Sequence, residues 1–208
     1  PNGKILDIGC AAGYFLNVAR EYGYTPVGVE IHHGMAEYAR KTFGVNVIEG
    51  DIESLNLGGR SYDIVYMGDV LEHLRDLVGI LSKVRTLLAE GGIFVLDGPL
   101  TLNRSLYNAI LRLKLHVRKL WRNSSVTEEP PYHLWEFNAN TIKRFLTSQH
   151  FMILEFAVKD EISSPGAKRF LPRVVKAISA VISNRLLRRW YFGNRVFIIS
   201  TPIKDYRR

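Results

Sequence analysis

The sequence predicts an α/β protein whose core is a doubly wound, mostly parallel sheet covered by helices on both faces. Two features of the first hundred residues support this fold class. Short apolar segments rich in Val and Ile alternate with segments of helical periodicity, and the loop Gly9–Gly13 joins the first such pair. Strands that are buried on both faces read as apolar runs, and their alternation with helices favours parallel pairing.

The elements of residues 1–100 follow one another at short intervals. The predicted strands are Lys4–Ile8, Thr25–Glu30, Asn46–Gly50, Tyr62–Met67 and Ile93–Asp97. The predicted helices between them are Gly13–Tyr22, Gly34–Phe43 and Leu74–Leu88. Apolar residues recur with helical period in the third helix, and we expect Gly91-Gly92 to end it.

Residues 101–208 have a different pattern, in which two basic helical segments separate short strands. The predicted helices are Leu102–Trp121, Thr141–Gln149 and Lys168–Trp190, and the predicted strands are Phe151–Val158 and Arg195–Thr201. The polar segment 123–131 ends in Pro-Pro and is a predicted loop. We expect the middle helix to be capped near Asn140.

Length and composition are those of one globular domain, residues 1–208. The single cysteine cannot form an internal disulfide, which fits a reducing, cytoplasmic location. No segment reaches the roughly 18 uninterrupted apolar residues of a membrane span, and no signal peptide is recognisable. Because the sequence begins at Pro1 without an initiator methionine, we expect a trimmed chain.

The net charge of +8 is unevenly distributed. Residues 1–100 hold 8 Lys/Arg and 13 Asp/Glu, a net of −5, whereas residues 101–208 hold 20 and 7, a net of +13. A basic half attracts an anionic partner, which can be nucleic acid, a phospholipid surface or a phosphorylated substrate. Charge alone does not choose among them.

The loop Gly9–Gly13 leaves a buried strand and opens a helix, where glycines and unpaired N–H groups allow a ligand to approach the backbone. A nicotinamide dinucleotide would require G-x-G-x-x-G, but Ala11 and Tyr14 occupy the later glycine positions. A P-loop is excluded because the sequence has no Gly-Lys-Ser/Thr.

Counting the loop Gly9–Gly13 after the first strand, potential ligand-binding groups follow four consecutive predicted strands. Glu30 and Asp51 end the second and third, and Asp69 with Glu72-His73 follows the fourth. A carboxylate at the end of the second strand can accept both ribose hydroxyls of an adenosine. Ligands of open parallel sheets bind beyond the carboxyl ends of the strands, so we expect the binding site at this edge.

These motifs together resemble the class I S-adenosylmethionine-dependent methyltransferase family. The matching segments, in order, are ILDIGCAAG (5–13), VGVE ending at Glu30, EGDIESL (49–55), YDIVYMGDVLEHL (62–74) and LLAEGGIFVLDGP (87–99). The resemblance implies a Rossmann-like sheet of seven strands with an antiparallel last strand and helical insertions after strands 5 and 6. It also divides the chain into a cofactor-binding half, 1–100, and an acceptor or lid half, 101–208.

The resemblance implies that the cofactor is S-adenosylmethionine and assigns a role to each motif residue. The methionine part of the cofactor is expected to contact Asp7, Gly9, Cys10, Ala11 and Gly13. The ribose is expected to contact Glu30, and the adenine Ile31, Asp51 and Ile52. Gly68 and Asp69 are expected near the sulfonium. Ala11 replaces the family's middle glycine, and we expect it to be tolerated with an ordinary negative φ.

Two histidines are candidate general bases for an acceptor hydroxyl. His73 follows the fourth strand, although it can equally be a polar residue at a helix start. His133 lies in a His-Leu-aromatic-x-Phe segment that resembles a small bacterial-type subfamily acting on sugars, lipids or quinone-like acceptors, although it can also be a core histidine. No metal is expected, because His32-His33 has no carboxylate partner at ligand spacing.

The predicted function is methyl transfer, with oxygen of a small, sugar-linked or lipid-linked molecule as the acceptor. The two basic segments can form amphipathic helices on an anionic membrane, or they can pack on the domain with their charges in solvent. Nucleic acid is the less favoured partner because no RNA-binding module is recognisable. A non-catalytic cofactor-binding domain and an RNA methyltransferase are the alternatives, and the sequence does not indicate the oligomeric state.

Overall fold

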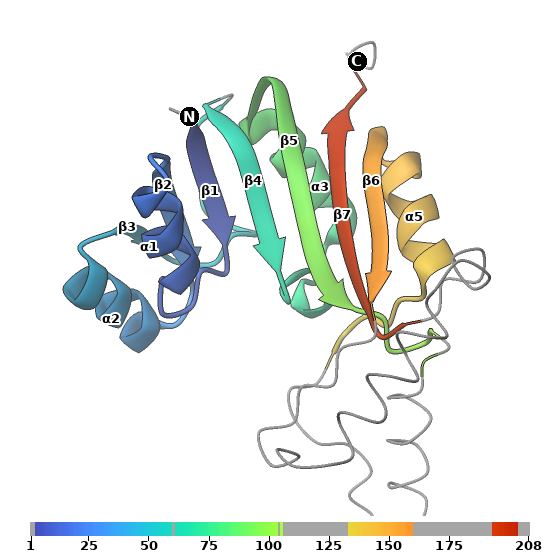
Figure 1. The fold of residues 1–208 in the computed structure, drawn as a ribbon, viewed down its shortest axis with the longest axis horizontal. Coiled ribbons are helices and arrows are strands. Elements are labelled where there is room, and N and C mark those ends of the chain that lie inside the picture. The colour runs from blue at the N-terminus through green and yellow to red at the C-terminus, as the bar shows by residue number, and fades with distance from the viewer. Residues whose placement is uncertain (1–2, 60, 104, 106–132, 160–192, 204–208) are drawn as a thin grey trace, which may run out of the picture.

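The computed structural model describes residues 3–59, 61–103, 105, 133–159 and 193–203. Within them the chain forms one seven-stranded sheet in the order β3-β2-β1-β4-β5-β7-β6 (Figure 1). The strands are β1 (Lys4–Ile8), β2 (Thr25–Glu30), β3 (Asn46–Glu49), β4 (Tyr62–Gly68), β5 (Leu88–Pro99), β6 (Phe151–Lys159) and β7 (Arg195–Pro202). The helices are α1 (Tyr14–Glu21), α2 (His33–Phe43), α3 (Leu77–Leu87) and α5 (Ala139–Ser148), with a short 3₁₀ turn η1 (Leu71–His73).

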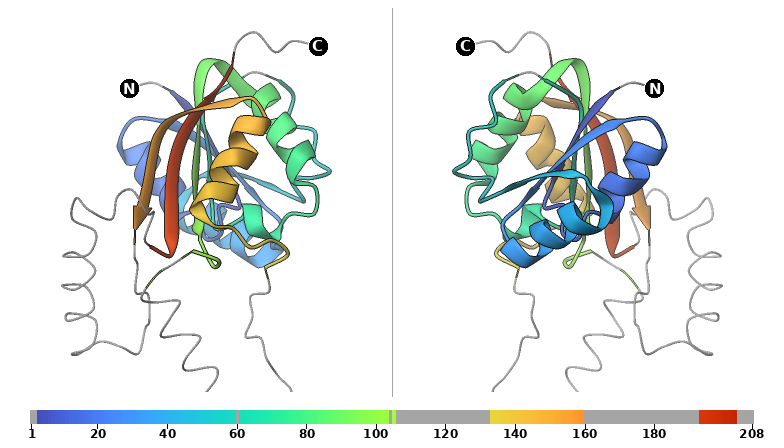
Figure 2. Two further views of the ribbon diagram at one scale, coloured as in Figure 1. Left: turned by 90° about the vertical axis from the view of Figure 1, so that its right-hand side faces the viewer. Right: turned by 90° about the vertical axis from the view of Figure 1, so that its left-hand side faces the viewer.

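The predicted fold class is confirmed. Strands β1 to β5 pair in parallel, and β7 lies antiparallel between β5 and β6. Helices α1 and α2 pack on β1, β2 and β3, while α3 and α5 cover the opposite face of the sheet (Figures 1 and 2). The predicted basic helices, the loop 123–131 and the helical insertions after strands 5 and 6 fall almost wholly outside the described residues.

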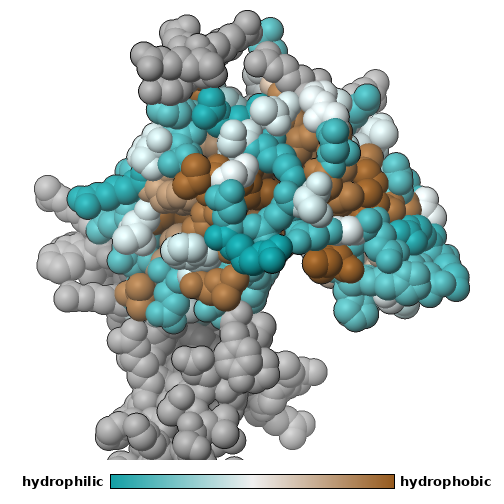
Figure 3. Space-filling view, turned by 180° about the vertical axis from the view of Figure 1, so that it is seen from behind, coloured by the Kyte–Doolittle hydropathy of each residue, from teal (hydrophilic) through white to brown (hydrophobic). Residues whose placement is uncertain are grey.

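The main core fills the space between the sheet and α3 and α5. Its fully buried side chains come from every central strand and from both helices: Leu6, Ile8, Met67, Leu81, Phe94, Ile142, Leu146, Phe151 and Ile198. A smaller cluster under α1 and α2 contains Cys10, Leu16, Ala36, Ala39, Val45 and Val47. Seen from behind, the surface is a mosaic in which hydrophobic patches are bordered by hydrophilic residues (Figure 3). No helix among the described residues is long and apolar enough to cross a membrane.

Several predicted boundaries were wrong, and the largest error is in β5, which spans Leu88–Pro99 rather than the predicted Ile93–Asp97. Helix α3 begins at Leu77 because the Asp76 carboxylate caps it by accepting the Gly79 N–H at 2.8 Å. The same helix ends at Leu87, and Gly91-Gly92 lie inside β5 rather than after the helix.

Helix α5 is capped by Asn138 rather than Asn140. The Asn138 side chain accepts the N–H groups of Asn140 and Thr141, each at 3.0 Å. The Thr141 hydroxyl in turn accepts the Asn138 N–H at 2.9 Å. This reciprocal arrangement is a capping box, which places the cap three residues before its partner side chain.

Candidate functional site

Strand order brings four predicted acidic residues to one edge of the sheet. Strands β3, β2, β1 and β4 are neighbours and parallel, so their carboxyl ends lie side by side. Asp7 lies in β1, Glu30 ends β2, and Asp51 and Asp69 follow β3 and β4. Four carboxyl groups at adjacent strand ends form an acidic rim, defined here as Asp7, Glu30, Asp51 and Asp69.

The loop Gly9–Gly13 turns sharply at this rim. Gly9, Ala11 and Gly13 all have left-handed backbones, with φ of 76°, 46° and 78°. The expectation of a negative φ at Ala11 was therefore wrong: the loop places an alanine in a left-handed conformation that favours glycine. Gly13 must lack a side chain, because a Cβ there would lie 2.7 Å from the Ala39 Cβ of α2.

The Glu30 carboxylate holds the loop in this shape. One of its oxygens accepts the Ala11 N–H at 2.9 Å, and the other accepts the His32 N–H at 2.8 Å. Each carboxylate oxygen has a second lone pair, so Glu30 can still accept two ribose hydroxyls. Ile31 beside it leaves 68% of its surface exposed, which suits a residue that covers one face of an adenine.

Asp7 is buried beneath the loop with 3% of its surface exposed. Burial, together with the charge of the neighbouring Glu30, raises its pKa to about 7. No cation among the described residues pairs with it. Cys10 is also buried, and desolvation raises the pKa of its thiol to about 12. The side chain of Cys10 therefore packs against β2 as a neutral thiol and has no nucleophilic role.

Asp51 and Ile52 are already engaged in contacts with the chain. One Asp51 oxygen accepts the Glu53 N–H at 2.9 Å, and the other lies 3.2 Å from the Arg75 guanidinium. The Ile52 side chain is in the core, and its carbonyl accepts a hydrogen bond from Lys83 Nζ. Of the two residues, Asp51 keeps its carboxylate partly exposed at the rim.

Asp69 is held by Arg195, which sequence reasoning did not identify. The guanidinium lies 2.9 Å from Asp69 and 2.8 Å from Asp97, and these pairs raise its pKa although burial opposes the shift. Asp69 also has a left-handed backbone, with φ of 53°. Gly68 precedes it, and a Cβ there would lie 2.5 Å from the Tyr66 hydroxyl.

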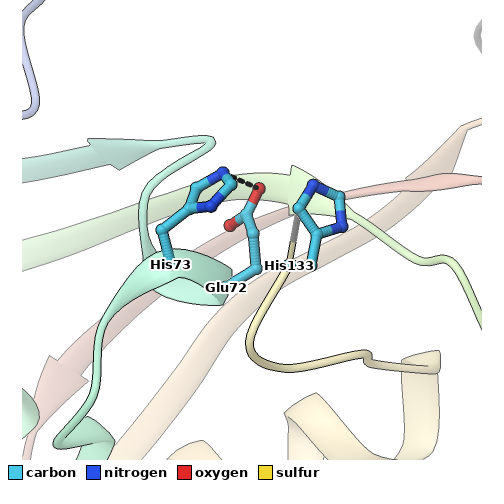
Figure 4. Close-up of side chains that lie close together, drawn as sticks. All are labelled: Glu72, His73 and His133. Atoms are coloured by element: carbon cyan, nitrogen blue, oxygen red, sulfur yellow. Dashed lines mark ion pairs between the residues drawn. The ribbon is translucent and has the colours of Figure 1, made fainter. Parts of the chain in front are cut away.

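Glu72, His73 and His133 come together beside Asp69, and we call them the Glu-His-His cluster. Their potential ligand atoms all lie within 4.8 Å of one another. The two imidazole rings are 5.0 Å apart between centroids, and the Glu72 carboxylate lies between them (Figure 4). His73 Nε2 is 3.9 Å from a Glu72 oxygen.

Burial sets the charge state of two of these groups. Glu72 is 3% exposed, and desolvation raises its pKa to about 7. Desolvation lowers the pKa of His133, and the charge of His73 lowers it further. His133 is therefore a neutral imidazole near pH 7, able to accept a proton.

Backbone hydrogen bonds bring His133 to the cluster from a distant part of the chain. The Glu72 carbonyl accepts the N–H groups of Leu134 and Trp135 at 2.9 and 3.1 Å. The Trp135 indole N–H donates to the Leu74 carbonyl at 2.8 Å. The segment that precedes α5 is thus fastened to η1, and both predicted candidate bases face the same buried carboxylate.

The interpretation of His32-His33 was wrong in one respect. His33 does have a carboxylate partner, because its Nδ1 lies 3.0 Å from Glu49. The His32 side chain instead accepts the Met35 N–H and caps α2. Neither histidine belongs to the group of potential metal ligands found among the described residues.

The residues of the acidic rim fit S-adenosylmethionine. This cofactor carries two cationic groups, a sulfonium and an ammonium, and the rim offers four carboxyl groups. Asp7 is the clearest feature, because a buried carboxyl group without a cationic partner gains most from a bound cation. When bound, the cofactor supplies the activated methyl group.

The comparisons with known proteins agree with this architecture. A family model described as "Methyltransferase domain" matches residues 6–96. The chain is 33% identical over 107 residues to a ubiquinone biosynthesis O-methyltransferase of Dinoroseobacter shibae, covering 49% of this chain and 42% of that protein. It is 29% identical over 96 residues to a malonyl-[acyl-carrier protein] O-methyltransferase of Serratia marcescens, covering 46% and 38%.

Among solved structures, a SAM-dependent methyltransferase of Archaeoglobus fulgidus superposes with a TM-score of 0.60 and 23% identity, covering 95% of this chain and 85% of that one. The fold is a domain of Rossmann-like topology with an acidic edge at the strand ends. The match over residues 6–96 and the two curated relatives support a class I S-adenosylmethionine-dependent methyltransferase domain in this part of the chain. The chain spans less than half the length of these two curated relatives.

Proposed function

We propose that the chain is an S-adenosylmethionine-dependent methyltransferase that methylates an oxygen atom of a small, sugar-linked or lipid-linked acceptor. The observation that carries this proposal is the pairing of two sites at one edge of the sheet. The acidic rim fits the cofactor, and the Glu-His-His cluster lies beside Asp69, where the resemblance puts the sulfonium. Asp69 precedes Glu72 and His73 by only three and four residues, and the His73 ring contacts the His133 ring, so the rim and the cluster adjoin each other.

The cofactor-binding residues supply position and charge in this proposal. Glu30 accepts the ribose hydroxyls, Asp7 neutralises the cationic methionine part, and Ile31 covers the adenine. Methyl transfer from a sulfonium is an in-line displacement of an already activated group. The protein therefore contributes mainly by aligning the two substrates and excluding water.

An acceptor hydroxyl must lose its proton as the new bond forms, and a neutral His133 can take it. His73 is the second candidate, since its ring faces the same carboxylate (Figure 4). The two relatives named above are O-methyltransferases, which supports oxygen as the accepting atom. Their names point to an acyl-carrier-bound acid and to quinone biosynthesis. Because a carboxylate has already lost its proton near pH 7, a histidine base is useful only for a hydroxyl acceptor, and we therefore propose a hydroxyl oxygen.

The decisive experiment has two stages. Calorimetry with S-adenosylmethionine tests the cofactor site, and a variant with Glu30→Gln should bind it at least about tenfold more weakly, because a charge-assisted hydrogen bond contributes about 1.5–3 kcal/mol. Transfer of a radiolabelled methyl group is then screened over phenols, acyl-carrier thioesters, sugars and lipids. Absence of cofactor binding would favour a non-catalytic domain over an enzyme. Methyl transfer to RNA alone would refute the proposal of a small, sugar-linked or lipid-linked acceptor.

Location and partner remain proposals as well. We propose a cytoplasmic protein with peripheral contact to anionic membranes, on the basis of the net +13 of residues 101–208. Co-sedimentation with anionic vesicles should exceed that with neutral ones and fall as salt is added. Equal sedimentation with both kinds of vesicle would refute the membrane contact, and the basic residues would then be better explained by binding of an anionic acceptor.

A further inference from the structure

We propose that Glu72, His73 and His133 form a binding site for one divalent transition-metal cation of the Zn²⁺ class. The geometry is the first argument. Three ligand atoms of the kinds that such cations prefer lie within 4.8 Å of one another, although the segments that carry them are about sixty residues apart. Their convergence depends on the hydrogen bonds from Leu134 and Trp135 to the Glu72 carbonyl.

The second argument is the burial of Glu72. Its carboxyl group has almost no contact with solvent, and the only ion pair recorded for it within the described residues is with His73 at 3.9 Å. Ionising a buried carboxyl group costs free energy unless a cation compensates. A single imidazole at that distance compensates poorly, and two imidazoles cannot both be protonated cheaply with their rings 5.0 Å apart. One cation bound by all three side chains would remove both costs. It would neutralise the Glu72 carboxylate, and it would bind the two imidazoles without their being protonated.

The donor set decides which cation fits. Two imidazole nitrogens and one carboxylate oxygen match the three protein ligands of catalytic zinc sites and of some iron sites. Mg²⁺ and Ca²⁺ prefer oxygen donors alone, so they are disfavoured. Metal–ligand bonds of about 2.0–2.2 Å require the ligand atoms to lie roughly 3–4 Å apart. Binding therefore needs only a slight inward rotation of the side chains.

Three protein ligands leave a coordination position open. The catalytic consequence rests on the proposed function: an acceptor oxygen could occupy that position and lose its proton more easily. The imidazoles would then act as ligands and not as the base. Asp69, which is ion-paired with Arg195, follows strand β4 and lies only three residues before Glu72, so the proposed metal site adjoins the acidic rim.

The test is direct binding of Zn²⁺ to the metal-free protein by calorimetry, with Co²⁺ absorption as a second readout of nitrogen ligation. We expect one equivalent to bind, with an affinity at least about a hundredfold weaker in His133→Ala. His133 is only partly buried, so this variant should fold, which far-ultraviolet circular dichroism checks. Glu72→Gln should weaken binding similarly.

His33→Ala is the matched control, because it removes a histidine that also contacts a carboxylate but lies outside the cluster. Zn²⁺ binding that is equal in the unsubstituted protein and in His133→Ala would overturn the proposal, as would binding that only His33→Ala removes. Cofactor binding is measured separately in the presence of a chelator. A failed metal site and a failed cofactor site therefore give different results.

Discussion

The substitution Asp7→Asn should stabilise the fold and weaken the cofactor site at the same time. It replaces a buried carboxyl group by a neutral group of the same shape. Asp7 has a pKa of about 7 in the folded protein against an ordinary value of 3.8, mainly because it is buried. The folded state therefore binds the Asp7 proton more tightly than the unfolded chain does.

The pH dependence follows from that difference. Below about pH 4 both states are protonated, and Asp7 contributes nothing. Between about pH 4 and pH 7 the unfolded chain ionises first, so rising pH favours unfolding; above pH 7 both states are ionised, and the penalty is constant. Three pKa units at about 1.4 kcal/mol each give an upper limit of about 4 kcal/mol. We expect roughly half of this, because an amide is not a perfect substitute for the protonated acid.

The assay is urea unfolding of both proteins at pH 4, 5.5 and 8. The gain in unfolding free energy should grow from near zero to about 2 kcal/mol across that range. Other titrating groups, such as Glu72, are present in both proteins and cancel in the difference. Asp63→Asn is the matched control, because Asp63 lies in an exposed contact with the Lys4 N–H and loses the same charge.

Cofactor affinity should move in the opposite direction. Calorimetry at pH 8 should show S-adenosylmethionine binding to Asp7→Asn about ten- to a hundredfold more weakly, the range expected for a charge-assisted contact. A variant that is destabilised at pH 8, or that is stabilised equally at pH 4 and pH 8, would refute the assignment of a buried, costly carboxylate. Unchanged affinity would remove Asp7 from the cofactor site.

Two further substitutions test other features of the same edge. Ala11→Gly should raise the free energy of unfolding by about 1 kcal/mol, because the native φ of Ala11 is left-handed. The control Ala12→Gly should lower it. Equal effects of the two substitutions in chemical denaturation would contradict the conclusion that the backbone is strained at Ala11. Arg195→Met should cost about 1.5 kcal/mol in thermal unfolding, since it leaves the partly buried Asp97 carboxylate and the exposed Asp69 carboxylate without their partner. Arg195→Lys should recover only part of this, and full recovery by Lys would show that the two-pronged guanidinium geometry is not needed.

The fold was predictable because its signals are local. Every strand found among the described residues was predicted, because apolar runs and the turns between them can be recognised from neighbouring residues in the sequence. The errors arose where a local signal has two structural meanings. Gly91-Gly92 was interpreted as a helix stop, but β5 already pairs with β4 at Leu88, and the glycines accommodate an irregularity within the strand. A Cβ at Gly92 would lie 3.1 Å from three backbone carbonyls, so glycine is needed for a close approach rather than for a cap.

The acidic rim was predictable for a related reason. Parallel strands joined by helices end at the same edge, so residues that follow successive strands meet there regardless of loop sequence. Arg195 was missed although the resemblance implies an antiparallel last strand, because it does not give the register in which β7 pairs with β5. That insertion starts β7 where β5 ends, pairing Arg195 with Pro99, and brings the guanidinium to the carboxyl-end residues Asp69 and Asp97.

The Glu-His-His cluster depends on a still longer connection. His73 and His133 were each identified as a candidate base, and each had an equally good structural explanation on its own. Glu72 was noticed only as part of a polar strand end. What joins them is the backbone of Glu72, whose carbonyl binds the segment that carries His133 while its carboxylate lies between the rings. One residue thus both fastens the segment and supplies the charge, so removing its side chain and removing its carbonyl contacts have separable effects. Glu72→Gln changes the carboxylate and leaves the backbone bonds intact, which makes it the substitution that separates chemistry from folding at this site.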